Sequence, residues 1–90
     1  MRTTKELLII LRDNIELSTI NGLCFLNITL LYKNIITDAE HTIIHDYIYN
    51  NQPSKKSKLY GGSDNGFYYW PKGEKEPRLR WLKYHIRINK

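Results

Sequence analysis

Cationic side chains gather near the C-terminal end of this 90-residue chain, where they could bind phosphate groups. Residues 72–90 carry seven Lys and Arg against two Glu, whereas residues 1–71 carry seven charges of each sign. The net charge of +5 therefore arises entirely from this last segment. Arginine forms charge-assisted, often bidentate hydrogen bonds with phosphate oxygens. Phosphate contacts are predicted for Arg78, Arg80 and Lys83, with Lys72 as a further ligand-binding residue.

Aromatic rings lie close to these cations in the sequence. Seven of the eleven aromatic residues fall between Tyr60 and Tyr84. A nucleobase stacks on an aromatic side chain, and a neighbouring Arg or Lys can then hold its phosphate. We therefore predict ligand contacts for Tyr68, Tyr69, Trp70, Trp81 and His85. The alternative is that the two Trp residues close a small core.

Residues 77–89 form two distinct faces when they are placed on a helix. Arg78 and His85 share one face with three apolar side chains. The opposite face is basic and comprises Arg80, Lys83, Tyr84 and Arg87. An Arg without a partner is expensive to bury, so either a carboxylate of the protein, with Glu74 and Glu76 as nearby candidates, or an anionic ligand should pair with Arg78. His85 is either a hydrogen-bonded core residue or a ligand contact.

No catalytic or metal-binding motif stands out elsewhere. His41 and His45 have a spacing that could place two ligands on one metal ion, but their segment lacks the Glu of the metalloprotease pattern. They are predicted to be surface histidines. The segment GGSDNG is rich in Gly, yet no Gly-Lys-Ser/Thr follows it, as a phosphate loop requires. We expect no catalytic residue, metal or cofactor, with a small hydrolase as an alternative.

Apolar periodicity and capping residues predict a mainly α fold of about four helices. Thr3 with Glu6, and Thr37 with Glu40, have the spacing of capping boxes. The predicted helices span 4–16, 23–34, 38–50 and 77–88. The chain is expected to form a single domain, 1–90. Its parts are a helical core over about 4–51, a long aromatic and Gly-rich loop over 52–76 that could contain a short hairpin, and a basic C-terminal helix over 77–88.

Small size and apolar surface together predict a homo-oligomer, most simply a dimer or a multiple of it. A 90-residue domain buries a limited fraction of its surface, and the lone Cys24 allows no internal disulfide. Ile9, Ile10 and much of the second helix are apolar beyond one core-facing stripe. No apolar run approaches the ~20 residues that span a bilayer. A cytoplasmic location without membrane association is expected.

Codon bias gives one hint about origin, because Ile, Asn, Lys and Tyr, all encoded by AT-rich codons, make up 36 of the 90 residues. This bias indicates an AT-rich bacterial or phage genome. Together with the small size and the lack of a known motif, it makes the chain resemble, in a general way, the accessory proteins that phages encode, among them oligomeric sponges that sequester immune signals. This resemblance implies a non-catalytic protein that binds a small anionic nucleotide, such as a cyclic dinucleotide or an ADP-ribose derivative, in the cytoplasm of an infected bacterium. The alternatives are nucleic-acid binding and inhibition of a host protein.

Overall fold

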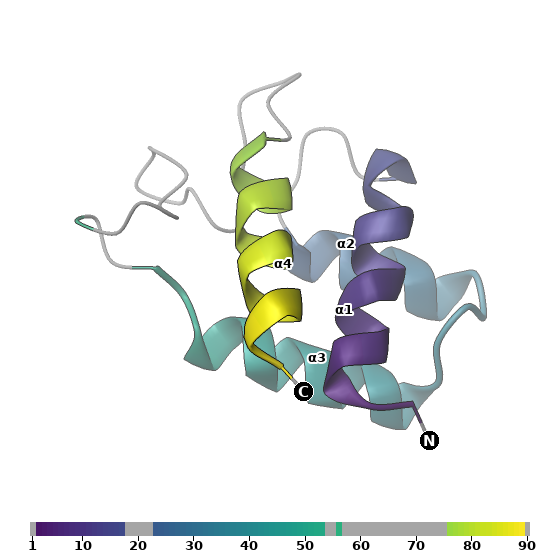
Figure 1. The fold of residues 1–90 in the computed structure, drawn as a ribbon. Coiled ribbons are helices and arrows are strands. Elements are labelled where there is room, and N and C mark those ends of the chain that lie inside the picture. The colour runs from purple at the N-terminus through teal and green to yellow at the C-terminus, as the bar shows by residue number, and fades with distance from the viewer. Residues whose placement is uncertain (1, 18–22, 54–55, 57–75, 90) are drawn as a thin grey trace.

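The computed structural model describes residues 2–17, 23–53, 56 and 76–89, which form four α-helices and no strand (Figure 1). The helices are α1 (Thr4–Asp13), α2 (Leu23–Tyr32), α3 (Asp38–Asn50) and α4 (Glu76–Ile88), and a short 3-10 helix, η1 (Ile15–Leu17), follows α1. The mainly α prediction is therefore confirmed. Most of the loop predicted over 52–76, with its hairpin, lies outside the described residues.

Both predicted capping boxes are present and fix the starts of α1 and α3. At α1, the amide of Glu6 donates to Thr3 Oγ1 at 3.2 Å, and the amide of Thr3 donates to Glu6 Oε1 at 2.8 Å. At α3, Thr37 and Glu40 exchange the same two bonds, at 3.2 and 2.9 Å. Each box satisfies amide groups that the first turn of a helix leaves unpaired. The predicted bounds of α3 are therefore correct at its start, and its predicted end is also confirmed.

Helices α1 and α2 end earlier than predicted, each at an Asn. The Asn14 side chain donates from Nδ2 to the carbonyl of Ile10 at 2.8 Å, and the chain then continues as η1. Asn34 takes the left-handed conformation, with φ 59°, that closes a Schellman motif. Its amide donates to the carbonyl of Leu31, and the amide of Ile35 donates to that of Leu30, both at 3.0 Å. Asn tolerates this conformation better than most residues, so the helix stops there.

The core lies between two pairs of helices. Helix α4 packs along α1 and runs in the opposite direction, while α2 packs against α3 (Figure 1). The fully buried apolar side chains come from all four helices: Leu7, Leu8 and Leu11, then Leu23, Leu26 and Leu30, then Ile44 and Ile48, then Trp81 and Leu82. Ile10, which the sequence left without a partner, packs at the edge of this cluster.

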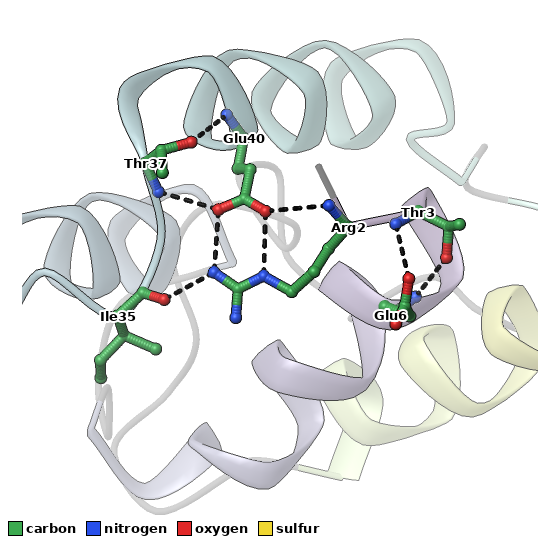
Figure 2. A network of polar contacts seen from close by, with 6 residues as sticks. All are labelled: Arg2, Thr3, Glu6, Ile35, Thr37 and Glu40. Carbon is green, nitrogen blue, oxygen red and sulfur yellow. Dashed lines mark hydrogen bonds and ion pairs between the residues drawn. The ribbon is translucent and has the colours of Figure 1, made fainter.

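A partly buried ion pair, between Arg2 and the buried Glu40, ties the N-terminal segment to the start of α3 (Figure 2). Arg2 donates from Nη2 to Glu40 Oε1 at 2.8 Å and from Nε to Glu40 Oε2 at 2.9 Å. The same Nη2 donates to the carbonyl of Ile35 at 2.8 Å. The Glu40 side chain is 4% exposed, and its hydrogen bonds, led by those from Arg2, hold the pKa of this carboxyl far below its ordinary value. One guanidinium thus joins three segments of the chain.

We expect Arg2→Ala to lower the melting temperature by about 10 °C, because it leaves the buried Glu40 carboxylate without its cation. Arg12→Ala is the matched control, since Arg12 pairs with Asp13 at the surface, where both side chains are exposed, and should cost little. The pair stabilises the fold above the ordinary Glu40 pKa of 4.5 and loses its effect as the pH falls below that value. Thermal melts at pH 7 and pH 3 should therefore show the Arg2→Ala deficit shrinking in acid. A deficit equal to that of Arg12→Ala at pH 7 would contradict this.

Candidate functional site

Helix α4 carries five of the nine residues predicted to bind a ligand, and it has one buried and one exposed side. It begins at Glu76, one residue before the predicted start, and Pro77 occupies its first turn, where a missing amide proton costs nothing. The buried side consists of Arg78, Trp81, Leu82 and His85. These residues are three or four positions apart, so they lie on one face of the helix. The predicted grouping of Arg78 and His85 with apolar residues is confirmed.

The opposite side of α4 is exposed and cationic. Arg80, Lys83 and Arg87 are all exposed there, and Tyr84 flanks them with 39% of its surface exposed. We call these four residues the basic face. The guanidinium carbon of Arg87 lies 5.4 Å from the centre of the Tyr84 ring, within the range of a cation–π interaction. Arg87 was not among the predicted ligand-binding residues, although its place in the helical repeat indicated this face.

Trp81 fixes α4 against the end of α3. Its side chain is fully buried, and its Nε1 donates to the carbonyl of Asn51 at 3.0 Å. The Tyr47 ring meets the indole edge-on, with 5.9 Å between centres. Asn51 in turn donates from Nδ2 to the carbonyl of Tyr47 at 2.8 Å. Trp81 therefore lies in the core, as one of the two alternatives predicted, and stacking of a base on it stays a prediction.

His85 is also buried and belongs to a small polar cluster between α3 and α4. Its Nδ1 lies 2.8 Å from the hydroxyl of Tyr47, and Asn89 donates from Nδ2 to the same hydroxyl at 2.9 Å. The Tyr47 hydroxyl can accept from Asn89 and also donate its proton to His85 Nδ1. This second bond requires a neutral imidazole with its proton on Nε2. Burial lowers the pKa of His85 and so favours this neutral form. The arrangement holds α4 in place, and a ligand contact by His85 stays a prediction.

Protonation of His85 should weaken the docking of α4. Because its pKa is lower in the folded state than the ordinary 6.5, the stabilisation is complete above pH 6.5 and is lost as the pH falls from 6.5 toward the lowered value. We expect the melting temperature of the protein to drop by several degrees between pH 7.5 and pH 5.5. His85→Gln should remove most of this pH dependence, whereas His45→Gln, at an exposed position on α3, should leave it intact. If the melting temperatures of the two variants depended on pH in the same way, His85 would not be the source of the pH dependence.

Arg78 is buried at the start of α4, with 1% of its surface exposed. Burial lowers its pKa, and the negative charge of Glu16 acts in the opposite direction. Glu16 belongs to η1, directly after α1, so a carboxylate distant in sequence influences this guanidinium. The sequence had indicated Glu74 and Glu76, whose side chains lie outside the described residues. A ligand contact by Arg78 stays a prediction.

Four of the predicted ligand-binding residues, Tyr68, Tyr69, Trp70 and Lys72, lie outside the described residues. The structure thus brings Arg80 and Lys83 together on an exposed face and places Arg78, Trp81 and His85 on the buried face of the same helix. Arg87 and Tyr84 complete the exposed group. This face can attract phosphate by charge, and Tyr84 offers an exposed ring beside it.

The two histidines of α3 do not form a metal centre with their described neighbours. Their ring centres are 6.2 Å apart. The Nε2 atom of His41 is buried, whereas Nδ1 of His45 lies at the surface, 3.5 Å from Oδ1 of Asp46. Within residues 2–17, 23–53, 56 and 76–89, no three His, Cys, Asp or Glu side chains are grouped so that they could hold a metal ion. None of the helices in those ranges is long and apolar enough to span a membrane.

No protein-family model, no curated protein and no solved structure matches the chain.

Proposed function

We propose that the protein binds, without catalysis, the phosphate backbone of a nucleic acid on the basic face of α4. The proposal rests on one observation, which is that α4 has an exposed cationic side and a buried side. Arg80, Lys83 and Arg87 extend from its exposed side, while its other side is packed into the core. Because the buried side fixes the helix, the backbone positions that carry the three cations are set in one row before a ligand arrives. Such preorganisation lowers the entropy lost on binding.

The dimensions of the row suit an extended polyanion. Arg80 and Arg87 are seven residues apart, which is about 10 Å along a helix. A DNA duplex carries about one charge per 1.7 Å of its axis, so several phosphates face a surface of this length. A helix face is convex and encloses little of a small ligand, whereas a long strand or duplex can lie along it. Contacts of this kind position a nucleic acid and read no sequence.

Sequestration of a small anionic nucleotide is the second candidate, and the cation–π pair favours it. Arg87 and Tyr84 place a ring and a guanidinium side by side at the surface, which is a combination that can hold a base and its phosphate. Completion of such a site would need further walls, for which Tyr68, Tyr69 and Trp70 are the proposed source. The phage origin and the anti-defence role remain part of this second proposal.

Fluorescence anisotropy with two labelled ligands separates these functions. One ligand is a DNA duplex of about 20 base pairs, and the other is a cyclic dinucleotide. Three phosphate contacts predict that duplex affinity falls about 40-fold between 50 and 200 mM salt. Failure to bind the duplex at 50 mM salt would contradict the proposal. Tight binding of the cyclic dinucleotide with little salt dependence, and its recovery unchanged after denaturation, would favour the second candidate.

A further inference from the structure

Helix α2 exposes an apolar surface on the side that faces away from the core. Phe25 is 51% exposed, Ile28 is 38% exposed and Tyr32 is 81% exposed. Their spacing of three and four residues places them on one face, which we call the α2 face. Cys24 and Leu31 flank it and are partly buried against the core. The other side of α2 contributes Leu23, Leu26 and Leu30 to the core, so both sides of this helix are apolar.

Charge indicates what could cover the α2 face. The segment Leu23–Tyr32 contains no charged residue, whereas the chain as a whole carries a net charge of +5. The exposed cations of the basic face lie on a different helix, α4, which packs along α1 (Figure 1). Two copies of the chain that meet through α2 would therefore make an uncharged contact. Their basic faces would not be pressed together, so little electrostatic repulsion would oppose the contact.

The pattern along the α2 face is also complementary to itself. When two α2 helices lie antiparallel about a two-fold axis near Ile28, Phe25 of each copy lies opposite Tyr32 of the other. The two Ile28 side chains then meet close to the axis. Aromatic pairs of this kind contribute beyond the area that they bury. A two-fold contact is self-complementary by symmetry and is the commonest kind of closed assembly.

We propose that the protein forms a homodimer through the α2 face, with its α2 helices antiparallel. A large side chain buries about 200 Å², so the exposed parts of Phe25, Ile28 and Tyr32 supply roughly 350 Å² per copy. This is less than the ~800 Å² per partner of a standard interface. The dimer should accordingly be weak, with a dissociation constant of about 100 µM or more. Nothing in this inference depends on nucleic-acid binding by α4.

Sedimentation velocity across a range of concentrations, from about 5 to about 200 µM, tests the dimer. The chain has a mass of 10.8 kDa, and we expect the measured mass to rise toward twice that value. Ile28→Glu and Tyr32→Glu should keep the protein monomeric throughout. Tyr32 is so exposed that its variant should fold normally, which circular dichroism can confirm. The matched control, Thr42→Glu, makes the same charge change at an exposed position of α3 and should still dimerise.

Cysteine cross-linking tests the antiparallel register. In a Cys24→Ser background, Ile28→Cys places a thiol near the proposed axis, and a disulfide needs Cα atoms within about 7 Å. Oxidation should link this variant into dimers, whereas Thr42→Cys in the same background should stay unlinked. Monomers at every concentration, or a dimer that survives both Glu substitutions, would overturn the proposal. Such a surviving dimer would mean that another surface joins the copies. Absence of the disulfide in a protein that still dimerises would overturn the proposed register.

Discussion

Replacement of Arg80, Lys83 and Arg87 by Glu is expected to weaken duplex binding at least about 100-fold at 50 mM salt. Each cation that contacts a phosphate contributes a charged hydrogen bond of about 1.5–3 kcal/mol, and Glu adds repulsion. All three side chains are exposed, and surface substitutions of this kind usually change stability by less than about 0.5 kcal/mol each. The three changes together should therefore cost no more than about 1.5 kcal/mol, so the variant should still be folded at the temperature of the titrations. Anisotropy titrations and thermal melts on the same preparations give both quantities.

A second triple variant distinguishes the contribution of the basic face to binding from that of the net charge. Arg12, Lys33 and Lys56 lie outside α4, and their replacement by Glu changes the net charge by the same amount. If the basic face binds the duplex, this control should lose far less affinity than the α4 variant. Equal losses in the two variants would mean that overall charge, and not this face, attracts the nucleic acid.

Trp81→Ala is expected to leave the protein largely unfolded at 37 °C. Removal of a fully buried Trp side chain costs about 3–5 kcal/mol, and the total stability of a domain is about 5–15 kcal/mol, with small domains at the lower end. The change also removes the hydrogen bond from Nε1 to the carbonyl of Asn51. Urea unfolding followed by circular dichroism measures the loss.

Two further variants divide this loss into its causes. Trp81→Phe keeps an aromatic ring but removes the indole N–H, so it should cost clearly less than Trp81→Ala. Tyr84→Ala removes an aromatic ring from the exposed side of the same helix and should change the melting temperature little. If the Trp81→Ala protein had the same melting temperature as the Tyr84→Ala protein, Trp81 would not be the residue that anchors α4.

Local signals in the sequence predicted the starts of the helices well and some of their ends poorly. A capping box lies within four residues, so Thr3 and Thr37 could be recognised without knowledge of the rest of the chain. The end of α1 was placed at Glu16 because apolar periodicity continues to Ile15. The Asn14 side chain competes for a backbone carbonyl at that point, and the helix gives way to η1. The apolar periodicity of a sequence alone does not indicate such competition.

The two faces of α4 were also predictable, because a helix repeats every 3.6 residues and the sequence separates its polar and apolar positions accordingly. The partners of the buried residues were not. Glu16 influences Arg78, Tyr47 bonds His85, and Glu40 binds Arg2, and each pair joins segments far apart in sequence. No local pattern encodes such contacts, since they arise only when the helices pack. The prediction missed Arg87 and Tyr84 at the candidate site because it gave more weight to the apolar face of α4 than to the exposed one.

Binding through the basic face is tested most directly by the salt dependence of duplex affinity in single-site variants. Each phosphate contact contributes about −0.9 to the slope of log K against log salt concentration. Three contacts predict a slope of about −2.7 for the wild type, and Lys83→Gln should change it to about −1.8 with an unchanged melting temperature. A wild-type slope near zero, or a slope that Lys83→Gln leaves unaltered, would contradict phosphate binding by this face.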